Sequence, residues 1–344
     1  MYLFLNTFFS QCPDEFYCKL LTIMASISLF CQIFSAIFLF KKYKRKKNEY
    51  IKFLLIVRSC HIFYNILGSY IGEFRTFLPR YTIICYGLIR YLGDIACSIS
   101  GSLFLSLAIA EGFCIIYAFN GQYNIIIREV RFHENNKLQW LSIFLMIIYF
   151  FLFFITFSLG TIPREEAIKN IYMVDNELKK YINGSFTIIA FGGSKTYMFN
   201  IYLTIAFTGM INTITHYIYI CGKIYKFIKN LQINKSSNIK RNYSKHFYHH
   251  IISSIFPVIL IYIPTLYLSL AVIFFTHEPY IEFGRTTTNA YSFIIISYSI
   301  VSSIYIVIYF WNHSSEESHK KSSLQIKGNM LLKKFIIRNN IDGK

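Results

Sequence analysis

Charged residues are scarce in this chain, and most of those present are basic. Only 15% of the 344 residues are Asp, Glu, Lys or Arg, against about a quarter in soluble domains. Hydrophobic residues make up 54% and aromatic residues 19% of the chain, and long apolar runs recur through most of its length. This composition excludes a soluble globular protein and predicts a single domain that crosses a membrane several times.

The sequence also lacks the patterns that bind metals or carry catalysis. Its 8 cysteines form no CxxC pair and do not cluster with histidine. Three histidines, His246, His249 and His250, lie close together but adjoin a basic loop without cysteine or carboxylate partners. No nucleophile elbow, zinc-protease motif, phosphate-binding loop or pair of carboxylates is present. We therefore expect no metal, no cofactor and no enzyme activity.

The apolar runs predict an all-α membrane protein with a bundle of seven transmembrane helices. An N-terminal segment, residues 1–15, precedes the bundle of residues 16–311, and a polar tail, residues 312–344, follows it and turns amphipathic near its end. At about 20 residues for each crossing, we expect the spans at about residues 16–40, 51–71, 83–119, 138–160, 198–221, 250–275 and 288–311.

The basic residues predict how the bundle is oriented. Most of the 35 Lys and Arg lie in the loops after the first, third and fifth spans and in the tail, including the run KKYKRKK at residues 41–47. Because positively charged loops stay in the cytoplasm, we expect the N-terminus outside. The net charge of +18 then reflects sidedness and attraction to anionic membrane lipid, and no nucleic acid partner is expected. Asn183, in a predicted outer loop, is a candidate for glycosylation.

Several ionisable residues fall within predicted spans, where charges are costly and normally face the bundle interior. Arg90 and Asp94 are four residues apart in the third span and either orient a polar ligand or neutralise each other. Arg58, His61 and Asn65 form one polar stripe along the second span. We expect the stripe to hydrogen-bond to neighbouring helices, with a ligand role for His61 as the alternative.

Two prolines mark the predicted sixth span. Pro257 and Pro264 lie two helical turns apart on roughly one face. Each removes a backbone donor and kinks the helix, so we expect a hinge that moves within the bundle.

The same region carries a family resemblance. The stretch YSKHFYHHIISS followed by FPVILIYIP, the seven spans and the acidic outer loop PREEAIKNIYMVDNELKKY resemble the nematode serpentine chemoreceptor superfamily. The str/srh-like group is the most similar, and the sra/srab/sre-like group is the alternative. The resemblance implies a GPCR-like chemosensory receptor in the plasma membrane, in the sensory cilia of neurons. Its expected partners are a small-molecule or peptide ligand and a heterotrimeric G protein.

The expected site residues fall into two groups. Ligand is expected in the outer half of the bundle, near Arg90, Asp94, Tyr267 and Asn289. The G protein is expected to face residues near the inner end, namely Glu111, Arg128, Arg131, Lys223, Lys226 and Lys245. Cys85, at the outer start of the third span, is expected to form a disulfide with Cys18 or Cys12, since the second outer loop has no cysteine.

Two departures from the family pattern leave alternatives open. No arginine follows Glu111, where rhodopsin-like receptors carry one, and the seventh span, YIVIYFWNHS, lacks the usual Tyr-Arg ending. An orphan receptor-like protein that does not couple is therefore one alternative. A transporter or channel subunit is another, although the sequence shows neither internal repeats nor a continuous line of charges.

Overall fold

The computed structural model of the chain describes residues 15–77, 82–134, 137–172, 187–191, 195–234 and 293–311, and the single residues 248, 251, 263 and 290. Most of the predicted sixth span lies outside these residues. So do several positions singled out above, namely Cys12, Asn183, Lys245, Pro257, Pro264, Tyr267 and Asn289.

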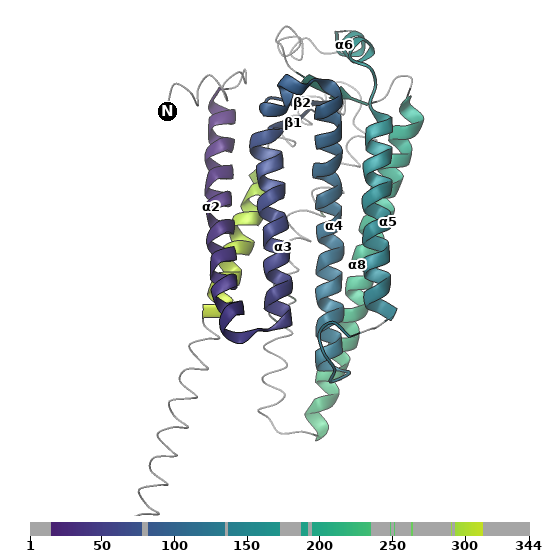
Figure 1. Ribbon diagram of the computed structural model, residues 1–344. Coiled ribbons are helices and arrows are strands. Elements are labelled where there is room, and N and C mark those ends of the chain that lie inside the picture. Colours follow the sequence, from purple (N-terminus) through teal and green to yellow (C-terminus); the bar gives the residue numbers. More distant parts are fainter. Residues whose placement is uncertain are drawn as a thin grey trace, which may run out of the picture.

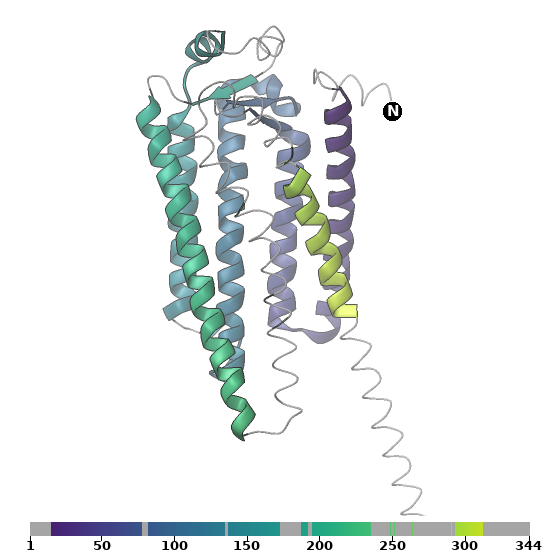
Figure 2. The same cartoon turned by 180° about the vertical axis from the view of Figure 1, so that it is seen from behind.

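The described residues form a bundle of long helices (Figure 1). These helices are α2 Glu15–Lys46, α3 Glu49–Ile66, α4 Asp94–Ile126, α5 Lys137–Gly160 and α8 Thr196–Asn234. A π-helical turn, η1 Leu67–Ile71, continues α3. The last helix, Phe293–Trp311, crosses α2 and α3 on the far side of Figure 1 and the near side of Figure 2. Helix α4 packs against α3, α5 and α8, so it is the central helix.

Five helices are long and apolar enough to cross a membrane, judged by length and composition in the described part of the chain. They are Phe16–Lys46, Glu49–Ile71, Asp94–Ile125, Lys137–Gly160 and Phe293–Trp311. Large apolar side chains such as Phe30 on α2 and Trp140 on α5 are exposed on the surface of the bundle. Lipid solvates such side chains, so this pattern fits a membrane bundle and would be unstable in water.

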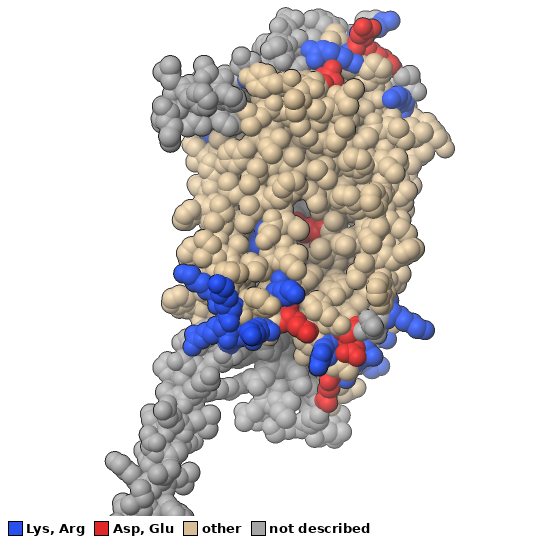
Figure 3. All heavy atoms as spheres, viewed as in Figure 1, with Lys and Arg blue, Asp and Glu red and all other residues tan. Residues whose placement is uncertain are grey.

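Charges lie at the two ends of the bundle, and the band between them is nearly uncharged (Figure 3). We call one end the basic end, because it carries residues 41–47, where α2 leads into α3. The other we call the sheet end, because a three-stranded antiparallel sheet covers it. The basic end is the one that the sequence predicts to be cytoplasmic.

The sheet was not expected from the sequence. Its strands are β1 Phe74–Phe77, β2 Thr82–Cys85 and β3 Thr187–Ala190, with β2 in the centre. Both β2 (TIIC) and β3 (TIIA) are buried along their whole length. A short apolar run is equally compatible with a strand and with part of a helix, which is why the third span was expected to begin near residue 83.

The central helix therefore begins later than predicted. After β2 the chain forms a short 3-10 helix, η2 Leu88–Leu92, and α4 starts only at Asp94. Gly93 separates the two with φ +89, a left-handed conformation that glycine adopts without strain. Arg90 and Asp94 consequently lie on different elements and do not share one helical face.

The core has one cluster toward each end of the bundle. Phe153, Phe157 and Tyr202 pack under the sheet with Ile189 of β3. Nearer the basic end, α4 and α8 interlock through a second set of buried side chains, Phe113, Ile116, Phe119, Ile220 and Ile224.

One residue of the basic run has a structural role. Lys42 is buried, and its Nζ donates a hydrogen bond of 2.6 Å to the Phe310 carbonyl at the end of the last helix. The ammonium also lies 4.6 Å from the centre of the Phe310 ring. A cation at a helix C-terminus compensates carbonyls that lack intrahelical partners. Lys42 thereby ties α2 to the last helix.

Candidate functional site

A buried polar network joins α3, α4 and the last helix. His61 Nε2 lies 2.8 Å from Glu111 Oε1, and the two side chains are only 7% and 13% exposed. The Tyr298 hydroxyl donates to the same carboxylate oxygen at 2.7 Å. Three segments far apart in the sequence therefore meet at one carboxylate.

Arg58 extends this network along α3 to the last helix. Its Nη2 donates to Ser302 Oγ at 3.0 Å, and its Nη1 lies 3.3 Å from both Ser303 Oγ and His61 Nδ1. Because a guanidinium can only donate, His61 Nδ1 must accept, and the ring proton of a neutral imidazole then lies on Nε2. The positive charge of Arg58 is thus linked to the negative charge of Glu111 through a neutral histidine. Such pairing makes ionised groups tolerable inside a membrane bundle.

The polar stripe on α3 behaves as the sequence predicted. Arg58, His61 and Asn65 all face the bundle interior. Asn65 Nδ2 donates to Ser28 Oγ of α2 at 3.1 Å, while Arg58 and His61 reach the last helix and α4. The prediction of hydrogen bonds from this stripe to neighbouring helices is confirmed.

The predicted position of Glu111 is wrong. It lies about midway along the 33-residue α4, buried and paired with His61, and not at the inner end facing a G protein. The error follows from the later start of α4. Glu111 is therefore not at the helix end where the arginine of rhodopsin-like receptors was expected.

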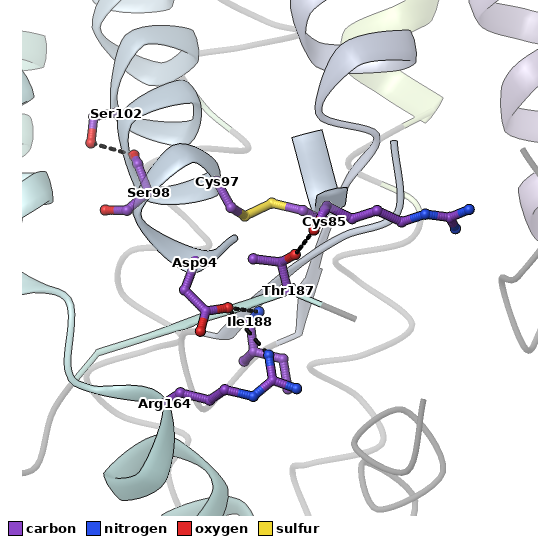
Figure 4. The surroundings of a disulfide bond; sticks show 9 residues. Cys85, Asp94, Cys97, Ser98, Ser102, Arg164, Thr187 and Ile188 are labelled. Atoms are coloured by element: carbon purple, nitrogen blue, oxygen red, sulfur yellow. Dashed lines mark hydrogen bonds and ion pairs between the residues drawn. A yellow bond between two sulfur atoms is a disulfide. The ribbon is translucent and has the colours of Figure 1, made fainter. Parts of the chain in front are cut away.

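A disulfide fixes the sheet to the central helix. Cys85 at the end of β2 is bonded to Cys97 in the first turn of α4 (Figure 4). The prediction that Cys85 pairs with Cys18 or Cys12 is therefore wrong, and Cys18 belongs to another disulfide. Sequence reasoning had placed Cys97 inside the third span. Once α4 begins at Asp94, both cysteines lie at the sheet end.

Asp94 is engaged by two other elements. Its Oδ1 accepts a hydrogen bond from the Ile188 amide of β3 at 3.1 Å and pairs with Arg164 Nη1 at 3.3 Å. Arg164 begins the short helix α6 Arg164–Tyr172, which lies beyond the sheet (Figure 1). Figure 4 shows these contacts beside the disulfide. The pair with Arg164 is partly exposed and contributes at most about 1 kcal/mol, so Asp94 mainly holds β3 and α6 against α4.

Arg90 is buried, and no carboxylate in the described part of the chain pairs with it. Its side chain is 8% exposed, and its Nη2 donates to the Tyr91 hydroxyl at 2.6 Å. The guanidinium carbon lies 4.7 Å from the centre of the Tyr91 ring. Nη1 has no hydrogen-bond partner in the part of the chain that the structure describes. Within the described residues, the predicted ion pair between Arg90 and Asp94 does not form.

A folded loop shapes the basic end. Phe132 is buried against the rings of Tyr50, Phe53 and Tyr117. Its carbonyl accepts a hydrogen bond of 2.7 Å from Gln139 Nε2. This anchor leaves the flanking basic residues of the loop exposed.

Four of the residues predicted to face a G protein have exposed side chains at this end. Arg128 and Arg131 lie in the loop, and Lys223 and Lys226 lie on α8. Arg128 Nη1 donates to Asn124 Oδ1 at 3.2 Å, and Lys223 Nζ lies 4.7 Å from the centre of the Tyr219 ring.

Sequence reasoning missed the part of the network on the last helix. Ser302 follows Tyr298 by four residues, and Ser302 and Ser303 follow Ser299 by three and four residues, which is the signal of a polar helical face. Hydroxyl side chains are common in membrane helices, where they bond to their own backbone, as Ser303 does with the Ser299 carbonyl at 2.8 Å. The spacing alone therefore did not distinguish this face from an ordinary one.

The apolar helices, the buried network and the disulfide-linked sheet define a seven-transmembrane receptor of GPCR-like fold. The chain matches the family described as Serpentine type 7TM GPCR chemoreceptor Srh over residues 12–312, and it belongs to that family. The resemblance to the serpentine chemoreceptors is thereby confirmed. A search of curated proteins found no match.

Proposed function

We propose that this chain is a chemosensory receptor that binds a small molecule or peptide in the half of the bundle under the sheet. The family match over residues 12–312 carries the proposal. It is supported by the disulfide-fixed sheet, which gives that half a rigid cover. Arg90, on the 3-10 helix η2 between β2 and α4, is the proposed ligand contact, together with Tyr267 and Asn289. Asp94 contributes by positioning β3.

Signal transmission is proposed to use the buried network. Arg58, His61, Glu111 and Tyr298 hold α3, α4 and the last helix in one arrangement. A ligand shifts a receptor between two arrangements only by binding them unequally. We place the moving part in the sixth span, with Pro257 and Pro264 as hinges.

The basic end is the proposed docking surface for a heterotrimeric G protein. Arg128, Arg131, Lys223 and Lys226 are exposed there, and Lys245 follows in the same predicted loop. With the N-terminus outside, this end faces the cytoplasm. The proposed location is the plasma membrane of sensory cilia on neurons.

Expression with a promiscuous G protein, followed by a screen of candidate odorants, tests the proposed function. We expect at least one odorant to evoke a signal that disappears when the G protein is omitted. Replacing both hinges, Pro257→Ala with Pro264→Ala, should leave surface expression measurable and abolish the signal. An unchanged signal in the double variant rules out the hinge, and a ligand-evoked current that persists without G protein favours a channel.

A further inference from the structure

Arg90 is an unusual cation for a membrane bundle, because its side chain is nearly buried and no carboxylate among the described residues neutralises it. The contrast with Arg58 is direct. Arg58 is equally buried, but both of its terminal nitrogens have partners, and it belongs to the network that contains Glu111. Among the described residues, the Arg90 side chain has one neutral hydroxyl partner, Tyr91, and its Nη1 has none.

Such an arrangement is costly for an empty receptor. Removing a cation from water without an opposite charge is strongly unfavourable, and buried cations are normally paired. The nearest acid along the chain, Asp94, is held by Arg164 and the Ile188 amide. Among the described residues, therefore, no carboxylate lies within ion-pair distance of Arg90.

The backbone holds Arg90 firmly in place. Its carbonyl accepts hydrogen bonds from Thr187 Oγ1 of β3 at 3.1 Å and from the Gly93 amide at 3.4 Å, and its amide donates to the Gly87 carbonyl at 3.2 Å. The disulfide between Cys85 and Cys97 closes the same segment. The contact with Tyr91 orients the guanidinium on this fixed backbone, and a side chain oriented before binding loses little entropy when it binds, which favours affinity.

We propose that Nη1 of Arg90 binds an anionic oxygen group, a carboxylate or a phosphate, and that this group is the polar end of the receptor's ligand. The proposal rests on the proposed function and deepens it by naming the chemical class of the ligand. A charge-assisted hydrogen bond from a guanidinium to such an oxygen is among the strongest in proteins. The anion supplies the charge that the described residues do not place beside Arg90.

A stability measurement tests the unbalanced charge without any ligand. We compare the melting temperatures of the purified full-length receptor, Arg90→Met and Arg58→Met, in a detergent buffer free of phosphate and carboxylates. Arg90→Met should melt within about 2 °C of the parent protein or above it, because an unbalanced buried charge is removed. Arg58→Met should melt several degrees lower or fail to accumulate. A drop of about 5 °C or more for Arg90→Met would show a structural partner and overturn the proposal.

A binding measurement tests the anion itself. The probes are hexanoate, its neutral amide hexanamide, inorganic phosphate and dihexanoyl phosphatidic acid, each titrated while the melting temperature is followed. At least one anion should raise the melting temperature, and hexanamide should not. Arg90→Gln should weaken binding, so that the half-saturating concentration of this anion rises at least about tenfold. Lys19→Gln, which removes an exposed charge on α2 near the same end of the bundle, should leave it unchanged.

The outcomes also identify the source of the anion. Stabilisation by hexanoate or phosphate assigns a soluble ligand, whereas stabilisation by the phosphatidic acid alone assigns a lipid headgroup. Stabilisation by none of them, or equal stabilisation of Arg90→Gln, overturns the proposal. No signalling is needed for this readout, so a failure to couple to a G protein would refute the proposed function and leave the anion site standing.

Discussion

At the scale of single residues, Glu111 connects the network. Its carboxylate contacts His61 of α3 and Tyr298 of the last helix, and through His61 it is linked to Arg58. The sequence identified three of these four residues as notable, because ionisable groups are rare in apolar spans. It did not indicate that they touch, since they come from helices distant in sequence and Glu111 was assigned to the wrong depth.

The network predicts unequal effects for two conservative substitutions. Glu111→Gln leaves Arg58 and His61 without a carboxylate, and breaking a buried pair in this way costs about 3 kcal/mol. Tyr298→Phe removes one hydrogen bond and keeps both charges, at a cost of about 0.6 kcal/mol in a membrane. Thermal unfolding of the purified receptor should therefore show a fall of about 5 °C or more for Glu111→Gln and a much smaller one for Tyr298→Phe. Equal falls would contradict the network as described.

At the scale of elements, α4 packs closely against the loop that follows it because α4 has a glycine at the point of contact. Gly121 of α4 faces the buried ring of Phe132, and a Cβ added at Gly121 would overlap that ring. Gly222 of α8 has nothing within 4 Å of the same added atom. Both glycines lie in long helices, so the helix propensity gained on substitution is the same. The two positions form a matched pair that differs in packing.

Alanine at these two positions should have opposite effects. Gly222→Ala gains up to about 1 kcal/mol of helix propensity and should raise the melting temperature. In Gly121→Ala the methyl group overpacks against Phe132, which costs about 1 to 3 kcal/mol of stability. This cost exceeds the gain in helix propensity, so the melting temperature should fall. Thermal unfolding of both single variants measures the two signs. A rise for both would mean that the loop does not depend on the close approach of Phe132 to α4.

At the scale of the whole molecule, charge separates the two ends of the bundle. The basic run at residues 41–47 and the exposed Arg128, Arg131, Lys223 and Lys226 lie toward the basic end. The sheet and its disulfide lie at the other end. Disulfides form in oxidising compartments, so their position agrees with the orientation predicted from the basic loops.

Glycosylation mapping tests this orientation. Asn183 and Asn242 both begin sequons, and the predicted topology places the first outside and the second in the cytoplasm. The receptor should carry a glycan that is removed by Asn183→Gln and unaffected by Asn242→Gln, seen as a mobility shift after glycosidase treatment. Residues 312–344 should resist protease added to intact cells. A glycan lost with Asn242→Gln, or a tail that external protease cleaves, would invert the topology.

The sequence by itself determined the class of the protein, the position of most long helices and the inward face of α3. These features depend on composition and periodicity within one segment. In lipid a spanning segment must be apolar and helical, and its polar side chains must face the bundle interior. Only the tertiary structure decided that Cys85 pairs with Cys97, that Glu111 meets His61 and Tyr298, and that Arg90 has no carboxylate partner among the described residues. Each of these depends on where α4 begins and on packing between distant segments. Local patterns do not encode that packing, because a short apolar run fits a strand as well as a helix.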